Sequence, residues 1–216
     1  MRPTSRGKED VTSTRSDEPP RESSETADLA GQLKLAIDTD DLEEVKRLMT
    51  GHPELHRAPL GASKCPPLTW AAFGGGPPSE TGLALARWMI ENGSDVHQGD
   101  DGPLIRAMAD PTFRMAELLV AHGADVNARY GGTYPLIMFP LEEFGPQALS
   151  WLLDHGADLH AAAKYCCPVG MLTCIYTRRP KDKSACLEIV GAAGFPLPDT
   201  PVMALHRRTS TATRRS

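Results

Sequence analysis

Four side chains with metal-ligating groups lie close together in the second half of the chain. Cys166, Cys167 and Cys174 follow His160 at short intervals, and thiolate and imidazole groups are ligands that zinc prefers. The adjacent pair of cysteines departs from the usual C-x-x-C spacing, so the sequence favours free, partly buried thiols over a metal site. Cys186 falls on an apolar helical stripe and is predicted to be a small core residue.

The 7 histidines form a second candidate set of metal ligands. His56, His97 and His160 occur at one position of a recurring pattern, and His122 and His155 occur at another. Equivalent positions in stacked helical layers lie about 10 Å apart. This is too far for one ion whose bonds are about 2.1 Å long. We therefore predict structural roles for these histidines and expect no metal and no cofactor.

Two carboxylate pairs are the candidates for acid–base chemistry. Asp100 is followed by Asp101, and Glu142 by Glu143. We expect both pairs to lie in turns, as solvated groups without the pocket and second catalytic group that such chemistry needs. The run Gly74–Gly76 lacks the preceding strand and the following Lys-Ser/Thr of a phosphate-binding loop. No catalytic residue is expected, and the protein is predicted not to be an enzyme.

Composition narrows the classes of partner. The chain has 216 residues and a formal net charge of -5, which disfavours nucleic-acid binding because phosphates are neutralised by positive charge. The longest apolar runs fall short of the ~18 residues of a membrane span, and there is no signal-peptide pattern. The odd count of 5 cysteines suits a reducing compartment. We expect a protein of the cytoplasm that binds neither nucleic acid nor membrane.

Self-similarity is the strongest feature of the sequence and indicates how these residues are positioned. Three stretches share an apolar helix end, a small or polar pair, an acidic residue, an aliphatic residue and Asn or His. They begin at Arg87 (RWMIENGSDVH), Glu117 (ELLVAHGADVN) and Ser150 (SWLLDHGADLH). Looser copies begin at Lys46 (KRLMTGHPELH) and Glu188 (EIVGAAGFPLP). About five repeats are therefore predicted.

Each copy is followed by a loop and a Pro-aliphatic pair that fits the first turn of a helix. These pairs begin at Pro67, Pro103, Pro135, Pro168 and Pro201. The segment that starts at Pro66 reads PPLTWAA, and the segment His122 to Asn127 reads HGADVN. Glycines follow three of the helix ends, where a left-handed residue can terminate a helix. The three glycines are Gly93, Gly123 and Gly156.

These two alternating signatures resemble the ankyrin repeat, with its T-P-L-H-x-A helix start and its period of about 33 residues. The resemblance covers roughly residues 30 to 206 and implies an all-α fold: an ankyrin-type repeat solenoid of stacked helix-turn-helix units with connecting loops. The His of the motif is replaced by Thr69, Ile105 and Ile137. Only Thr69 could partly take over the hydrogen bonds that this His makes between loops.

Apolar spacings of three and four predict the second helix of each unit. The predicted segments are 42–49, 83–90, 113–120 and 148–153, and Asp40 or Asp41 is expected to cap the first of them. Trp88 and Trp151 share a column with Leu118 and are predicted to be core. For Trp70 we expect packing between repeats, with a direct binding role as the alternative.

The resemblance also implies a function, which is non-catalytic binding of a protein partner through the loop tips and the concave face. By register, the loop tips supply Lys64, Asp100, Asp101, Arg129, Tyr130, Thr133, Lys164 and Tyr165, and the end of a first helix supplies Phe73. Tyr130 and Tyr165 stand in corresponding loops, each after a basic residue, and Tyr is frequent at interface hot spots. The alternative is that these tyrosines pack on their own loops.

The two ends are predicted to lie outside the repeat domain. Residues 1–27 are rich in Ser, Thr, Pro and mixed charge and are expected to be disordered, as are residues 207–216; the domain is placed at 28–206. The alternative function arises here, because TPVMALH from Thr200 begins a further repeat that stops. The chain would then be a truncated fragment of a longer ankyrin array with no independent function. Val202, Met203 and Leu205 would be uncovered and would cause self-association.

Overall fold

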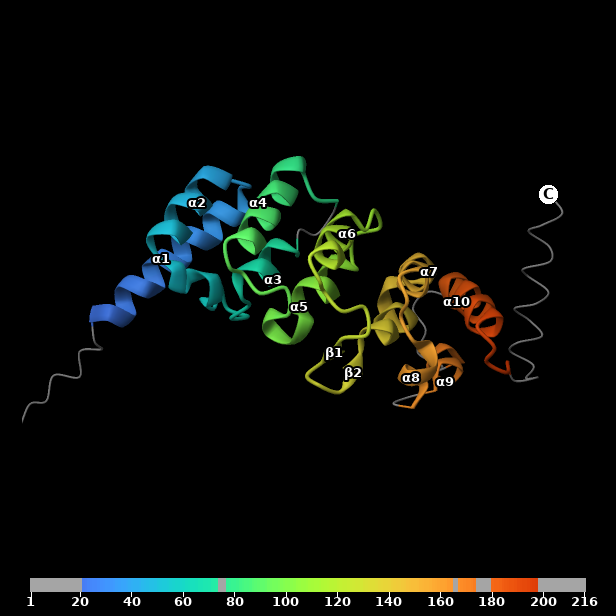
Figure 1. Ribbon diagram of the computed structural model, residues 1–216. Helices are drawn as coiled ribbons and strands as arrows, with labels where there is room; N and C mark the ends of the chain where they lie inside the picture. Colours follow the sequence, from blue (N-terminus) through green and yellow to red (C-terminus); the bar gives the residue numbers. More distant parts are fainter. Residues whose placement is uncertain (1–20, 74–76, 165–166, 174–179, 198–216) are drawn as a thin grey trace, which may run out of the picture.

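The computed structural model describes residues 21–73, 77–164, 167–173 and 180–197, and most of these residues are helical (Figure 1). The predicted all-α class is therefore confirmed. The α-helices are α1 (Arg21–Asp38), α2 (Leu42–Gly51), α3 (Pro67–Ala71), α4 (Glu80–Glu91), α5 (Gln98–Ala107), α6 (Arg114–Ala121), α7 (Pro146–Asp154), α8 (Leu159–Ala163), α9 (Pro168–Thr173) and α10 (Pro180–Ala192).

The helices follow one another in chain order along one direction (Figure 1). Helices α2, α4, α6, α7 and α10 lie along the upper edge of the view, and α3, α5, α8 and α9 lie along the lower edge. Within a pair, α1 contacts α2, α3 contacts α4, and α5 contacts α6. Between pairs, α2 contacts α4 and α4 contacts α6, while α1 contacts α3 and α3 contacts α5. Each pair therefore covers the apolar side of the next.

The predicted second helices are present, and local chemistry explains their ends. The Asp41 carboxylate accepts a hydrogen bond from the Glu44 N–H at 3.0 Å and caps α2. The Ser79 hydroxyl caps α4 in the same way, through the Gly82 N–H at 2.8 Å. The three glycines that were predicted to end helices all have a positive φ, which is +112° for Gly93, +97° for Gly123 and +89° for Gly156.

The core runs through all the pairs as one cluster of buried side chains. The aliphatic residue of four of the five repeated stretches belongs to it, since Leu55, Val96, Val126 and Leu159 are all buried, whereas Leu197 of the fifth is partly buried. The acidic residue before the buried aliphatic residue accepts hydrogen bonds from backbone N–H groups of the residues that follow. For example, Asp125 Oδ1 accepts from the Asn127 N–H at 2.8 Å, and Asp158 Oδ1 accepts from the Ala161 N–H at 2.8 Å. This recurrence accounts for the Asp-aliphatic-Asn/His pattern of the sequence.

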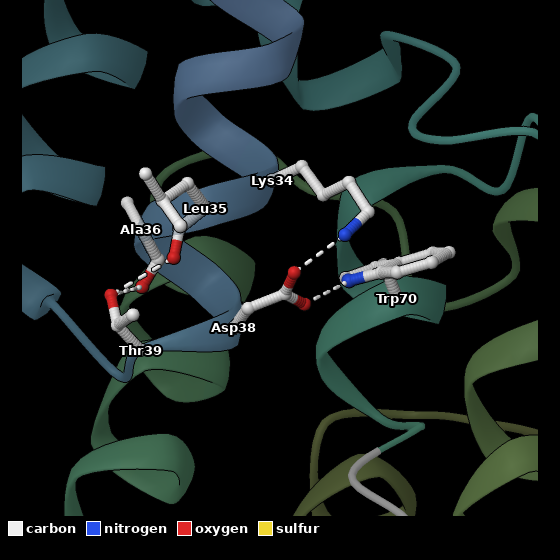
Figure 2. Close-up of polar contacts among 6 residues, drawn as sticks. All are labelled: Lys34, Leu35, Ala36, Asp38, Thr39 and Trp70. Carbon is white, nitrogen blue, oxygen red and sulfur yellow. Dashed lines mark hydrogen bonds and ion pairs between the residues drawn. The ribbon is translucent and has the colours of Figure 1, made fainter.

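Polar side chains connect one helix pair to the next. Figure 2 shows the first connection, in which Trp70 Nε1 of α3 donates to Asp38 Oδ1 of α1 at 2.7 Å. Lys34 Nζ binds the other oxygen of Asp38 and lies 4.6 Å from the centre of the Trp70 ring. Burial alone would raise the pKa of Asp38, but the hydrogen bonds from Lys34 and Trp70 lower it below its usual value. The predicted packing of Trp70 between neighbouring units is thus confirmed.

The recurring His/Asn position makes further connections of this kind. His56 Nδ1 lies 2.6 Å from Ser94 Oγ in the interior. Asn127 Oδ1 accepts from the Asp158 N–H at 2.7 Å, and His160 Nε2 lies 3.1 Å from the Ala193 carbonyl. His97 differs, because its Nδ1 binds Asp101 within its own unit at 2.6 Å. The structural roles predicted for these histidines are consistent with these bonds.

The tryptophans follow their predictions to different degrees. Trp151 is buried, as is Leu118, and the Trp151 Nε1 donates to the Glu117 carboxylate at 2.8 Å. Trp88 is only half-buried, and its ring stacks at 6.3 Å on His56. The predicted core position is confirmed for Trp151 and is partial for Trp88.

Three segments depart from the predicted pattern. Helix α5 begins at Gln98, so Pro103 lies inside it and not at its start. Pro135 ends the strand β2 (Tyr134–Pro135) and precedes the 3-10 helix η2 (Leu136–Met138) instead of an α-helix. Helix α1 begins at Arg21, before the predicted boundary at residue 28. Pro67 and Pro168 do begin helices, as predicted.

Several predictions fall outside the described residues. They concern the tail residues 1–20 and 207–216, the run Gly74–Gly76, and the residues Tyr165, Cys166 and Cys174. The C-terminal residues on which the truncated-array alternative depends also lie outside: Pro201, Val202, Met203 and Leu205.

Candidate functional site

A groove of about 520 Å³ opens between three successive segments of the chain. The first is the turn that follows Leu60, the second is the facing surface of α3 and α5, and the third is the strand β1 (Arg129–Tyr130) with the segment after β2. The lower edge of Figure 1 shows α3, α5 and the β1–β2 hairpin side by side. The wall includes Lys64, Thr69, Phe73, Arg106, Tyr130 and Phe139.

Two exposed aromatic side chains line this groove. Phe73 is 54% exposed and Tyr130 is 52% exposed. Among the described residues, the only other exposed large apolar side chain is Leu35, which lies elsewhere on α1. Single exposed apolar groups are normal on a protein surface, whereas a cluster of them indicates a contact surface. The gathering of two such rings in one concavity therefore marks it as a candidate binding site.

The hairpin fixes the position of Tyr130. Strands β1 and β2 pair antiparallel, with Tyr130 opposite Tyr134, and the turn between them contains Gly131 and Gly132 at φ +59° and +68°. Such a turn needs left-handed residues, which glycine adopts without steric cost. The Tyr130 ring meets the Phe139 ring edge-on at 6.2 Å. Tyr130 thus packs partly on its own loop, as in the alternative reading, and still presents half of its surface.

A similar turn places Lys64 on the wall of the groove. Leu60 and Cys65 form an isolated antiparallel bridge, and within the turn Gly61 and Lys64 have φ values of +62° and +50°. Lys64 is exposed, and among the described residues no carboxylate forms an ion pair with it. Its ammonium group is therefore available at the rim of the groove.

Arg106 supplies a second positive charge. Its guanidinium carbon lies 4.9 Å from the centre of the Phe73 ring, which is a cation–π arrangement. Arg106 is exposed, and no ion pair holds it within the part of the chain that the structure describes. A guanidinium that lies over an aromatic ring keeps N–H groups in its own plane that can donate hydrogen bonds.

The structure brings three of the predicted binding residues together: Lys64, Phe73 and Tyr130 all line the groove. Arg129 and Thr133 lie in the hairpin, but the Arg129 guanidinium donates to the Thr133 carbonyl at 3.1 Å and neither residue lines the groove. Lys164 is exposed at the end of α8, well apart in sequence from these segments.

The assignment of Asp100 and Asp101 to a loop tip was wrong. Both residues lie in α5. The first turn of this helix is unusual, because Gly99 and Asp101 have φ values of +61° and +59°. The bond from His97 to the Asp101 carboxylate holds this turn and raises the pKa of His97. The carboxylate pair Glu142 and Glu143 is likewise not in a simple turn, since it lies in the π-helix η3 (Pro140–Phe144).

Sequence reasoning missed Arg106 and Phe139 as groove residues. Arg106 occupies the position that Trp70 has in the preceding copy, where contact between units was expected. Its contact with Phe73 depends on how α3 lies against α5, which the local sequence does not indicate.

Thr69 was the residue that could partly take over the hydrogen bonds between loops, but its Oγ1 is buried without a hydrogen-bond partner among the described atoms. Gln98 makes the bridge instead, with Oε1 accepting from the Leu68 N–H at 3.1 Å.

The remaining chemistry-bearing side chains have separate positions. Cys65, Cys167 and Cys186 are free thiols, and burial raises the pKa of Cys186 to about 11. Within the described ranges, no three His, Cys, Asp or Glu side chains gather closely enough to hold a metal ion. In the same residues, every helix is too short or too polar to cross a membrane.

Comparison with the models of known protein families gave no match for this chain, and comparison with curated proteins gave none either.

Proposed function

We propose that this chain is an ankyrin-type repeat array, a scaffold or adaptor without catalytic activity, which binds a protein partner through the groove between α3, α5 and the β1–β2 hairpin. Three features support the ankyrin type. Helix pairs follow one another in chain order, the PPLTWAA and HGADVN segments alternate in the sequence, and Asn127 connects successive turns by hydrogen bonds.

The observation that carries the binding proposal is the gathering of Phe73 and Tyr130 in one groove. Each ring exposes more than half of its surface, so each would bury apolar area when covered by a partner. Aromatic and Arg side chains dominate the binding energy of protein interfaces, and they act from concave, well-packed positions. Arg106, which lies against Phe73, adds an Arg side chain to these two aromatic rings.

The experiment that tests this proposal uses affinity capture with the full chain as bait. Baits are the wild type, the double variant Phe73→Ser/Tyr130→Ser, and Leu35→Ser as the matched control. Leu35 is 64% exposed but lies outside the groove, so its variant removes equivalent exposed apolar surface. Captured proteins are identified by mass spectrometry, purified, and titrated against each bait.

We expect a protein that binds the wild type and the Leu35 variant equally, with affinity for the double variant reduced at least about 30-fold, since the loss of even one hot-spot aromatic costs about 2 kcal/mol. Thermal melts establish that all three baits are folded. Equal affinity for all three would place the binding surface elsewhere, and a folded wild type that captures nothing reproducibly would contradict the binding function.

We further propose that the protein acts in the cytoplasm. The free thiols of Cys65, Cys167 and Cys186 support a reducing compartment. A fluorescent fusion of the full chain, imaged with markers for the secretory pathway, tests this assignment; retention in secretory compartments would contradict it.

A further inference from the structure

We infer that the groove recognises a protein segment in which one carboxylate side chain stands beside an aromatic or large aliphatic side chain. This inference rests on the proposed function and specifies the chemistry of the partner. It is drawn from the pairing, in a single concavity, of exposed aromatic rings with cations that have no carboxylate partner among the described residues.

The cations define where the carboxylate would bind. Some described cations have acidic partners, as Lys34 has Asp38 and Arg114 has Glu80, whereas others, such as Arg87 and Lys164, have no ion pair with a described residue. Lys64 and Arg106 are set apart because both line the groove, and neither has a carboxylate partner among the described residues. The chain as a whole carries a net charge of -5, so this local excess of positive charge is not a general property of its surface. A carboxylate that enters the groove would be attracted by both charges.

Arg106 is also held in an orientation suited to this role. Stacking on Phe73 restricts the guanidinium, so less conformational entropy is lost when it binds. A planar guanidinium presents two parallel N–H groups, which match the two oxygens of a carboxylate. The same stacking places the apolar ring of Phe73 next to the site of the charge. Recognition of an acidic side chain and of its apolar neighbour would therefore occur together.

The apolar part of the groove determines which side chain of the partner must stand beside the carboxylate. The rings of Phe73, Tyr130 and Phe139 line a space of about 520 Å³, within the range of about 300–1,000 Å³ that is typical of ligand pockets. One large side chain of the partner fits such a space.

The probe is a library of short random peptides displayed on phage and selected on the immobilised full chain. The selected consensus peptide is then synthesised with a fluorophore, together with a version in which its acidic residue is replaced by the matching amide. Both peptides are titrated against the wild type, Lys64→Gln/Arg106→Gln, Phe73→Ser/Tyr130→Ser, and the control Leu35→Ser, each shown by thermal melting to be folded.

We expect the consensus to contain Asp or Glu within two positions of an aromatic or large aliphatic residue. Replacing either the peptide carboxylate or the two cations should weaken binding about tenfold or more, and combining both changes should add little, because both remove the same contact. Raising the salt concentration should weaken the wild-type complex more than the amide version.

The outcomes separate this inference from the proposed function. A consensus without an acidic residue, or one that binds the Lys64→Gln/Arg106→Gln variant as tightly as the wild type, would overturn the inference. If such peptides still lose affinity for the Phe73→Ser/Tyr130→Ser variant, the groove remains a binding site of different chemistry. If selected peptides bind that variant and the wild type equally, both proposals fail.

Discussion

Thr69 leaves no room for a side chain at Gly102. A Cβ atom at Gly102 would lie 2.9 Å from Thr69 Cγ2 and 3.0 Å from Thr69 Oγ1. The absence of a side chain at this position lets α5 approach α3 closely, beneath the groove. The contact joins two helices of neighbouring pairs, which explains why the chain has a glycine inside a helix, where glycine is otherwise unfavourable.

Gly102→Ala is expected to destabilise the protein by about 1–3 kcal/mol, since the added methyl group forces α3 and α5 apart. Thr69→Ala removes both obstructing atoms as well as a buried hydroxyl without a hydrogen-bond partner. It should therefore restore much of the stability when combined with Gly102→Ala. Urea melts of the two single variants and the double variant measure this coupling.

Gly31→Ala is the control for that cycle. Gly31 lies within α1, and a Cβ there has nothing within 4 Å. Its replacement should stabilise the helix by up to about 1 kcal/mol. If Gly102→Ala behaves like Gly31→Ala, or if Thr69→Ala fails to rescue it, the close approach of the two helices is contradicted.

Leu119 should be essential for the packing of α6. It is fully buried, and α6 contacts both α4 and α5. Leu119→Ala is expected to lower the free energy of unfolding by about 2–5 kcal/mol because it leaves a cavity. Leu35→Ala, at an exposed site, should change it by less than about 0.5 kcal/mol. Urea titrations followed by circular dichroism compare them, and equal midpoints would contradict the proposed core.

The two histidines at corresponding positions should respond to pH in opposite directions. Burial lowers the pKa of His56 from 6.5, so the unfolded chain binds the proton more readily and stability falls as the pH drops below 6.5. The hydrogen bond to Asp101 raises the pKa of His97. The stability that this hydrogen bond contributes is fully present below pH 6.5, and it is lost as the pH rises through the raised pKa of His97.

His56→Gln and His97→Gln separate these contributions. Urea midpoints measured from about pH 5 to 8 should show a weaker loss of stability toward acid for His56→Gln than for the wild type. For His97→Gln the loss toward acid should be steeper. The comparison uses the slope with pH and not the absolute stability, because either substitution also alters packing. Parallel slopes for all three proteins would contradict the assignment.

Cys186 should resist alkylation in the folded protein. Its side chain is buried and its pKa is raised to about 11, so the reactive thiolate is scarce at neutral pH. Cys167 is exposed and should react readily. Treatment with iodoacetamide and peptide mapping by mass spectrometry, with and without urea, distinguishes the two. Modification of Cys186 at the rate of Cys167 without urea would show that α10 does not shield it.

Sequence patterns predicted the second helices well because their signals are local. The apolar spacing of 42–49 and the acidic residue before it determine both the buried face and the cap of α2. The helix ends at the glycines after α4, α6 and α7 were predicted equally well, since a left-handed residue ends a helix regardless of what packs around it.

Prediction was wrong where contacts between units decide the conformation. The segment from Gln98 to Gly102 contains two glycines and two aspartates, which favour a loop. In the structure it is helical, and three contacts hold it: the Leu68 N–H donates to the Gln98 side-chain oxygen, His97 binds Asp101, and Gly102 lies close to Thr69. Two of these three contacts involve residues of the preceding unit, so the sequence of the segment alone does not contain the information.

The candidate groove was predicted only in part for the same reason. Phe73 and Tyr130 were identified from their register, because an exposed aromatic residue at a helix end or hairpin tip is recognisable in sequence. Arg106 was missed, since its significance lies in its contact with Phe73, a residue that follows the end of another helix. A binding surface assembled from successive units becomes visible only when the units are placed side by side.

The polar links between neighbouring pairs also have a kinetic consequence. The Leu68–Gln98 bond joins residues 30 positions apart, and the Ser79–Asp40 bond joins residues 39 positions apart. Each link therefore closes a loop of modest length, and the entropy lost on closure grows only slowly with loop length. Folding rates decrease as the mean sequence separation of native contacts increases. A chain connected in this way can begin folding at any junction between two pairs, without first bringing its distant ends together.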